Sequence, residues 1–126
     1  MLAYMLTYTH EKKIIFYRTL DGRCPVEEFF DSISSKELQK VTWVLRIVED
    51  LDMVPRQYFK KLADTDEIWE CRIDIGRMGY RILCFMDLGN LVILTNGFGK
   101  KSQKTPPDEI SRAERYRDDY LKRRKP

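Results

Sequence analysis

The sequence lacks most of the side chains from which common active sites are built. Its 126 residues contain one histidine, His10, so a metal site with several imidazoles, or a pair of histidines acting as acid and base, is excluded. It also contains no Walker loop, no Gly-x-Ser-x-Gly elbow and no His-Glu-x-x-His motif. These absences exclude most of the common hydrolase mechanisms.

Cysteine and long apolar runs are also scarce. The three cysteines, Cys24, Cys71 and Cys84, are too far apart in sequence to form the close pairs that usually bind zinc, and we interpret them as buried thiols. No apolar run approaches the roughly 20 residues needed to cross a bilayer, and residues 1–11 lack the basic start and small-residue cleavage signal of a secretory peptide. The sequence therefore predicts a cytoplasmic protein that enters no membrane and uses no metal or other cofactor.

The chain is long enough for one compact domain. Its 126 residues, 43% of them hydrophobic, predict a single domain over 1–126, with 1–11 as a lead-in and 122–126 as a basic tail. The net charge is only +3, but ten of the 23 Lys and Arg residues lie after Phe98, against five Asp and Glu. This basic end favours contact with phosphates, although a solvated helix surface would have the same composition.

Hydrophobic periodicity divides the chain into helices and strands. Ser34 and Glu37 form a capping-box pattern before apolar residues at helical spacing, which predicts the longer of two central helices. Apolar residues alternate on both sides of the turn at 76–79, which predicts an antiparallel hairpin. The expected strands are 13–18, 68–75, 80–86 and 91–98, and the expected helices are 25–33, 35–51 and 107–122, with 53–62 as a connector. This order, β-α-α-β-β-β-α, predicts an α+β domain with a twisted antiparallel sheet packed against two helices.

Two details of this plan bear on a functional site. The closing helix begins after Thr105, its expected cap, and has only a narrow apolar stripe, so we expect it to dock weakly. The carboxylates are expected on helix surfaces and turns, with no pair facing one way from the strands. A carboxylate base on the sheet, or a carboxylate-bound metal ion for a nuclease, is therefore not expected.

Cations gather near the expected sheet. Arg72 and Arg81 lie about equally far from the turn at 76–79, so antiparallel pairing makes them neighbours. Two adjacent arginines repel each other unless an anion lies between them, and arginine suits bidentate contact with phosphate. We expect Arg81 to face solvent. The alternative is that each arginine pairs with Glu70 or with another acid on the same face.

Four stretches of the sequence carry a resemblance to a known family. They are Lys60–Leu62, Ile68–Ile73, Gly79–Leu83 and Asn96–Pro106. In this order and spacing they resemble the RelE/ParE superfamily of toxins from toxin–antitoxin systems, and most of all its HigB-like, phage-derived branch. The Lys-Lys-Ser-Gln-Lys-Thr-Pro run at 100–106 is the most specific part, and the resemblance extends over about residues 21–120.

The resemblance implies a RelE-like fold and a type II toxin that inhibits translation as a ribosome-dependent mRNA endoribonuclease, or mRNA interferase. It implies no metal, and as partners the ribosome with its mRNA and a helix-turn-helix antitoxin. It assigns catalytic roles to Lys61, Arg72, Tyr80, Arg81 and Lys101. It assigns RNA contacts to Lys60, Lys100, Gln103, Lys104, Lys122, Arg123 and Arg124. The group that accepts the 2′-hydroxyl proton stays open between Tyr80 and a lysine with a lowered pKa.

Two other functions fit the same scaffold, because a fold does not specify an activity. One is a non-enzymatic inhibitor that binds DNA gyrase, as ParE toxins do, and the other is a phage-derived module that has lost its activity. Convergence of cations from three segments favours the nuclease, since an inhibitor that binds a protein does not need it.

Overall fold

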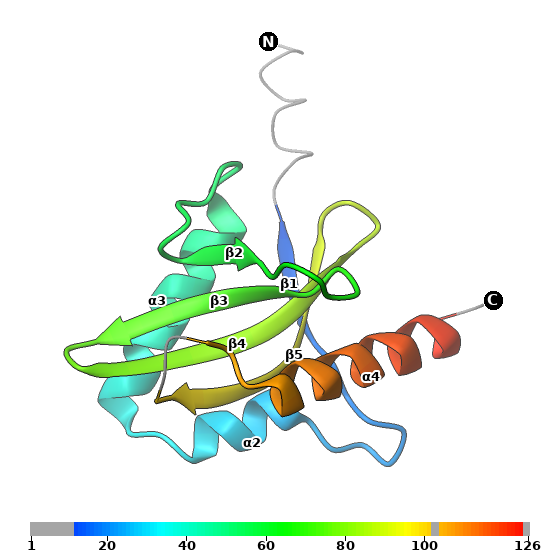
Figure 1. Cartoon of the computed structure of the whole chain (residues 1–126), viewed down its shortest axis with the longest axis horizontal. Helices are drawn as coiled ribbons and strands as arrows, with labels where there is room; N and C mark the ends of the chain where they lie inside the picture. The colour runs from blue at the N-terminus through cyan, green and yellow to red at the C-terminus, as the bar shows by residue number, and fades with distance from the viewer. Residues whose placement is uncertain (1–11, 102–103, 125–126) are drawn as a thin grey trace, which may run out of the picture.

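The computed structural model of the chain describes residues 12–101 and 104–124 (Figure 1). Over these residues the chain forms five strands and three helices, in the predicted order with one strand added. The strands are β1 (Lys13–Phe16), β2 (Phe59–Lys61), β3 (Trp69–Ile75), β4 (Met78–Asp87) and β5 (Leu91–Lys100). The helices are α2 (Pro25–Asp31), α3 (Ser35–Asp50) and α4 (Pro107–Arg123). The predicted α+β domain is confirmed.

The strands form one mixed sheet in the order β1-β5-β4-β3-β2. Strands β2 to β5 pair in antiparallel fashion, but β1 lies parallel to β5, with Phe16 opposite Leu94. The expectation of a wholly antiparallel sheet is therefore wrong at this edge, because the long connection through two helices and three strands lets β5 return in the direction of β1. Strand β2 lies in the expected connector, and its three residues are too few to show an alternating pattern.

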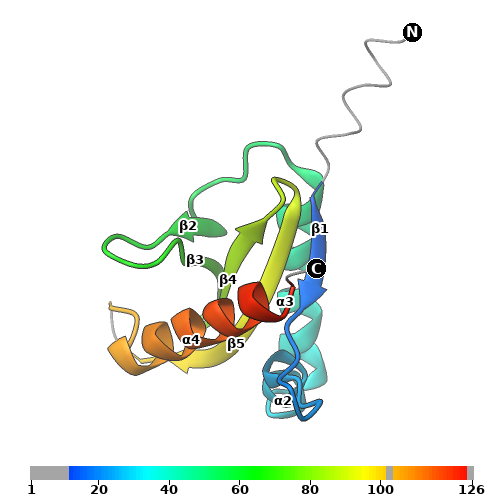
Figure 2. The same cartoon turned by 90° about the vertical axis from the view of Figure 1, so that its right-hand side faces the viewer.

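Helices cover both faces of the sheet (Figure 2). The α2 and α3 helices pack on one face, over a core that contains Val44, Ile73 and Ile82. The α4 helix crosses the other face, over a smaller core that contains Phe85 and Ile93. Each fully buried side chain of this size contributes roughly 1.5–3 kcal/mol by leaving water. The two-helix layer is thus as predicted, and α4 forms a layer of its own.

The starts of α3 and α4 show where local sequence was and was not sufficient. The Ser34 hydroxyl accepts from the Glu37 backbone N–H at 3.1 Å, and the Glu37 carboxylate accepts from the Ser34 N–H at 2.9 Å, so the capping box is confirmed. The expected cap of α4 is wrong. Pro106 occupies the N-cap position, and the Thr105 hydroxyl donates instead to Oε1 of Glu70 at 2.8 Å. Thr105 therefore joins the start of α4 to the sheet.

Polar contacts anchor α4 more firmly than its narrow apolar stripe indicated. The Tyr17 hydroxyl donates to Oδ2 of Asp119 at 2.5 Å, and the Tyr120 hydroxyl donates to Oδ2 of Asp87 at 3.0 Å. Burial and the bond to Asp119 raise the pKa of Tyr17 to about 12, so this phenol stays a donor. Because α4 extends to Arg123, the first two residues of the expected basic tail belong to a helix.

The cysteines agree with the expectation of buried thiols, and the helices bear on the expectation that the chain enters no membrane. All three cysteines are buried free thiols, as predicted. Burial raises the pKa of the Cys84 thiol well above its ordinary value, which keeps it protonated and unreactive. Within the described part of the chain, no helix is both long enough and apolar enough to cross a membrane.

Candidate functional site

One face of the sheet carries a group of charged side chains beside the start of α4. On β3, Glu70, Arg72 and Asp74 alternate with residues of the α2–α3 core, so all three project from the α4 side. Directly paired residues of neighbouring strands share a face, and the register therefore extends the group. The pairs are Lys60 with Glu70, Arg72 with Arg81, and Gly79 with both Asp74 and Lys100. We call Lys60, Glu70, Arg72, Asp74, Arg81 and Lys100 the charged face.

Arg81 is buried at the centre of the charged face. It is 4% exposed, and its Nη1 donates to Oδ1 of Asp74 at 3.1 Å and to the Tyr80 carbonyl at 2.8 Å. Its Nε lies 3.9 Å from Oε1 of Glu70, and the Nε of Arg72 lies 3.7 Å from Oε2 of the same carboxylate. The expectation of a solvent-facing Arg81 is wrong, and the alternative that the arginines pair with Glu70 is confirmed.

Glu70 places one negative charge between the two arginines without accepting a hydrogen bond from either Nε atom. Both distances exceed the upper limit of about 3.2 Å for a good N–H to oxygen hydrogen bond. Among the residues that the structure describes, the Nε atoms of Arg72 and Arg81 are buried and have no hydrogen-bond partner. A buried donor left in this way costs roughly 1–3 kcal/mol. Among the described residues, Arg117 Nε and Asn96 Oδ1 also lack a partner, so the distinguishing feature of this face is that two such donors occupy paired positions on adjacent strands.

Lys100 borders a cleft of about 420 Å³ that opens next to Arg81. Burial, and then the nearby Arg81, lower the pKa of the Lys100 amine from its ordinary value. A Cβ at Gly79 would lie only 3.3 Å from Oδ1 of Asp74, so a glycine here lets the Asp74 carboxylate lie close to the β4 backbone. The cleft thus combines a fixed guanidinium, a lysine that loses its proton more easily, and space for a ligand beside them.

A known family model covers this part of the chain. It is the model for Phage derived protein Gp49-like (DUF891), and it matches residues 28–118. The chain belongs to the Gp49-like family. The match runs from α2 into α4 and includes every residue of the charged face. No curated protein matches the sequence.

The register of β2 places two of the expected lysines on opposite faces of the sheet in this Gp49-like chain. Lys60, expected only as an RNA contact, lies opposite Glu70 on the charged face. Lys61, expected as catalytic, lies opposite Trp69 of the α2–α3 core and so starts from the other face. Its ammonium pairs with Oε2 of Glu67 at 2.8 Å. The sequence contained no signal for this distinction, because it depends on which residue of β2 pairs with Glu70.

Tyr80 also lies on the face opposite Arg81. Its ring packs 5.9 Å from that of Phe29, and its hydroxyl donates to Oε2 of Glu37. This bond, together with burial, raises the pKa of Tyr80. The structure therefore does not bring Tyr80 to the arginine pair, and it makes the phenol a weaker base candidate than Lys100.

The remaining predicted residues are spread around the site. Lys101 is exposed and lines the same cleft as Lys100, while Lys104 is exposed and Gln103 lies outside the described residues. The basic residues of the last turn of α4 each pair with an aspartate: Lys122 with Asp118, Arg123 with Asp119, and Arg124 with Asp87. Since α4 has 17 residues and rises about 1.5 Å per residue, this end lies roughly 25 Å from the end beside Glu70. The structure thus separates the terminal basic cluster from the charged face.

Of the two carboxylates of the charged face, Glu70 was expected only as an alternative partner of the arginines, and Asp74 was not named as one. Glu70 and Asp74 face the same way from β3, contrary to the expectation that no such pair exists on the sheet. The alternation of charged and core residues in Trp69–Ile75 could have revealed them. In the stretches 12–101 and 104–124, no three His, Cys, Asp or Glu side chains come together as a metal site.

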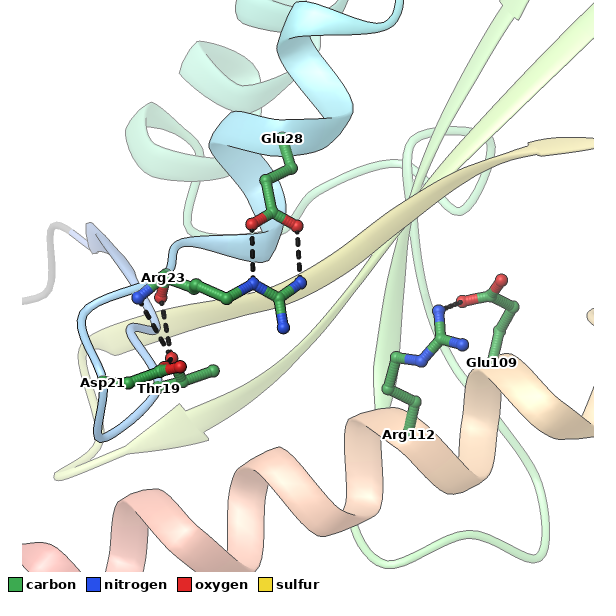
Figure 3. A network of polar contacts seen from close by, with 6 residues as sticks. All are labelled: Thr19, Asp21, Arg23, Glu28, Glu109 and Arg112. Atoms are coloured by element: carbon green, nitrogen blue, oxygen red, sulfur yellow. Dashed lines mark hydrogen bonds and ion pairs between the residues drawn. The ribbon is translucent and has the colours of Figure 1, made fainter.

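A second cleft, of about 640 Å³, contrasts with the charged face. It is lined by residues of α2, α4 and the end of β5, together with Arg23, which precedes α2. Arg23 donates to both carboxylate oxygens of Glu28, at 2.9 and 2.8 Å, and Arg112 donates to Glu109 at 3.3 Å (Figure 3). These exposed arginines donate hydrogen bonds to nearby acids, whereas the buried Nε donors of Arg72 and Arg81 have no hydrogen-bond partner among the described residues.

Proposed function

We propose that this Gp49-like chain is the toxin of a type II toxin–antitoxin system and acts as a ribosome-dependent, metal-independent mRNA endoribonuclease that inhibits translation. The observation that carries the proposal is the pair Arg72 and Arg81. Their buried Nε donors have no hydrogen-bond partner among the described residues, and the same face holds Lys60 and Lys100. The phage-derived family and the resemblance to HigB-like toxins support it. The alternative of an inactive phage-derived module gives no function to this pair of arginines.

The charged face suits attack by a ribose 2′-hydroxyl on the adjacent phosphate. In that reaction the 2′-oxygen forms a bond to phosphorus, the bond to the 5′-oxygen breaks, and negative charge grows on the two non-bridging oxygens. Arg72 and Arg81 supply the donors that stabilise this charge, which is the largest contribution that a preorganised site can make. Lys100, with its lowered pKa, accepts the 2′-hydroxyl proton in its neutral form. The leaving 5′-oxygen takes a proton from solvent water, and the Lys100 ammonium then returns its proton to the hydroxide formed.

The proposed site differs by two residues from the set that the resemblance implied. Lys60 and Lys100 replace Lys61 and Tyr80 beside the arginines, because only the first two share their face. Lys101 contacts a neighbouring phosphate from the edge of the cleft. The other residues that the resemblance assigns to RNA extend the contact, namely the amide Gln103 and the basic Lys104, Lys122, Arg123 and Arg124.

The proposal includes the partners and the compartment that this reaction requires. Ribosomes and mRNA are in the cytoplasm, so the chain acts there. The proposed site has a single lysine as base and does not itself align the 2′-hydroxyl with the phosphate. The ribosome supplies this alignment, and orientation alone can lower the barrier by several kcal/mol. A helix-turn-helix antitoxin, rich in acids, neutralises the cations.

Cleavage on translating ribosomes by protein that has been stripped of metal beforehand tests the proposal. We expect mRNA fragments with 2′,3′-cyclic or 3′-phosphate ends, and little cleavage of free mRNA. Ends with a 3′-hydroxyl would identify a metal-dependent nuclease and refute the mechanism. An absence of fragments, together with inhibition of DNA gyrase supercoiling, would establish the ParE-like alternative.

A further inference from the structure

Glu70 is a buried carboxylate, and the packing of the core does not explain why a charged residue lies at this position. It is 3% exposed and lies on β3 between the two arginines and the start of α4. Burial of a carboxylate is costly unless partners compensate it. Its neighbours on β3, Trp69 and Cys71, serve the core on the other face, so an uncharged residue at this position would disturb no strand pairing.

The contacts of Glu70 divide into one good hydrogen bond and two loose ion pairs. The hydroxyl of Thr105 donates to Oε1 at 2.8 Å. The two arginine Nε atoms stay 3.7 and 3.9 Å away, at ion-pair distance but beyond hydrogen-bond reach. Thr105 therefore holds the carboxylate in a position from which its single negative charge is shared by both guanidiniums, without a hydrogen bond to either Nε atom.

An oxyanion of the ligand would satisfy donors that Glu70 does not. A phosphodiester carries one negative charge on two oxygens, as a carboxylate does, and can accept from both arginines. With four cations and two carboxylates the charged face has a net charge of +2, so the phosphate is attracted even while Glu70 is present. Lys60, directly opposite Glu70 on β2, is positioned to pair with the displaced carboxylate.

We propose that Glu70 is an internal counter-ion that occupies the anion position between Arg72 and Arg81, and that the phosphodiester of the substrate displaces it. The identity of the displacing ligand rests on the proposed function; the exchange itself rests on the contacts above. Thr105 is then a positioning residue, because its hydroxyl stabilises the form in which the site is closed by Glu70. The counter-ion keeps the buried Arg81 guanidinium and the partly buried Arg72 beside it compatible with folding before RNA arrives.

Titration with inorganic phosphate tests the exchange without ribosomes or RNA. The N–H resonances of the Arg72 and Arg81 Nε atoms are followed by NMR in the full chain, in the variants Thr105→Val and Glu70→Gln, and in the double variant. Removing the Thr105 hydrogen bond destabilises only the closed form, so we expect Thr105→Val to bind phosphate about threefold to tenfold more tightly. Glu70→Gln should bind at least as tightly, and adding Thr105→Val to it should change nothing further.

The matched control is Thr42→Val, which removes an exposed threonine hydroxyl on α3 that donates to the Gln39 carbonyl. It should leave phosphate binding unchanged. Thermal unfolding checks each variant, and if Glu70→Gln does not fold, the comparison of Thr105→Val with Thr42→Val decides. Unchanged or weaker binding by Thr105→Val overturns the exchange, as does an equal gain in the Glu70→Gln background.

The outcome is distinguishable from that of the proposed function. Tighter phosphate binding by Thr105→Val without any cleavage of mRNA would keep the exchange and refute the endoribonuclease. Cleavage of mRNA, together with a phosphate affinity that Thr105→Val does not change, would support the endoribonuclease and refute the exchange.

Discussion

The two faces of β3 and β4 use the same backbone for opposite purposes. Toward α2 and α3 the strands present a dry layer, in which Ile73 and Ile82 are fully buried among apolar side chains. Toward α4 the intervening positions, such as Arg72 and Arg81, are charged, and two of their buried donors are unpaired. Among the described residues, the unpaired buried donors lie on the second face of these strands and not on the first. The core and the candidate site are thus one residue apart along the strand, because successive side chains point to opposite faces.

The largest effect is expected at Arg81, where the charged face is most deeply buried. Arg81→Ala should lower mRNA cleavage by roughly 100-fold or more, since it removes a preorganised donor from the phosphate. It should also lower the free energy of unfolding by about 3–5 kcal/mol, because Glu70 and Asp74 lose their buried partner. Cleavage on ribosomes and urea denaturation measure the two losses. The exposed Arg46→Ala on α3 is the control, and a folded Arg81→Ala with full cleavage would show that the charged face is only structural.

Ile82 follows Arg81 directly and tests the other face. Ile82→Ala should cost about 2–5 kcal/mol in the free energy of unfolding, because it opens a cavity in the α2–α3 core. Cleavage per folded molecule should stay unchanged. Urea denaturation and ribosome assays at low temperature provide the measurements. A specific loss of cleavage in the folded variant would mean that the two faces are coupled.

The pH dependence of cleavage tests the role of Lys100. Because burial and Arg81 lower its pKa, the neutral amine forms at a lower pH than in a free lysine, whose pKa is about 10.4. Cleavage should rise from about pH 6 to about pH 9, as the fraction of neutral amine grows about tenfold per unit below its pKa. Lys100→Arg should remove this rise, and Lys101→Arg should keep it. A rise that survives in Lys100→Arg assigns the proton transfer to another group.

The smallest effect is expected at Tyr80, on the core face of β4. Tyr80→Phe should leave cleavage unchanged and lower stability less than Ile82→Ala, since it removes only the bond to Glu37. Tyr80 and Ser34 hold the pKa of Glu37 below its ordinary value, so the stability that this carboxylate contributes is present above pH 4.3 or so and is lost as the pH falls through its lowered pKa. Unfolding curves across this range should show a weaker pH dependence in Tyr80→Phe. A loss of cleavage would return Tyr80 to the catalytic residues.

Local patterns were sufficient for much of the fold and for half of the site. The capping box of Ser34 and Glu37 started α3 where expected, since both partners lie within one turn. Alternation around the turn at 76–79 was enough to pair Arg72 with Arg81, because a hairpin register follows from the turn. The stretch that follows β5 was informative by resemblance, and the matched family agrees with a phage-derived origin.

The other half of the site depended on contacts between distant segments. The choice of Lys60 over Lys61 followed from the register of β2, a strand too short to have a pattern of its own. The burial of Arg81 between Glu70 and Asp74, and the hydrogen bond from Thr105 across 35 positions of the sequence, exist only when β3, β4 and the start of α4 come together. The parallel pairing of β1 with β5 joins the two ends of the domain in the same way. Periodicity determines which face a side chain takes within its own strand, whereas its partners across the sheet are determined by the packing of the whole chain.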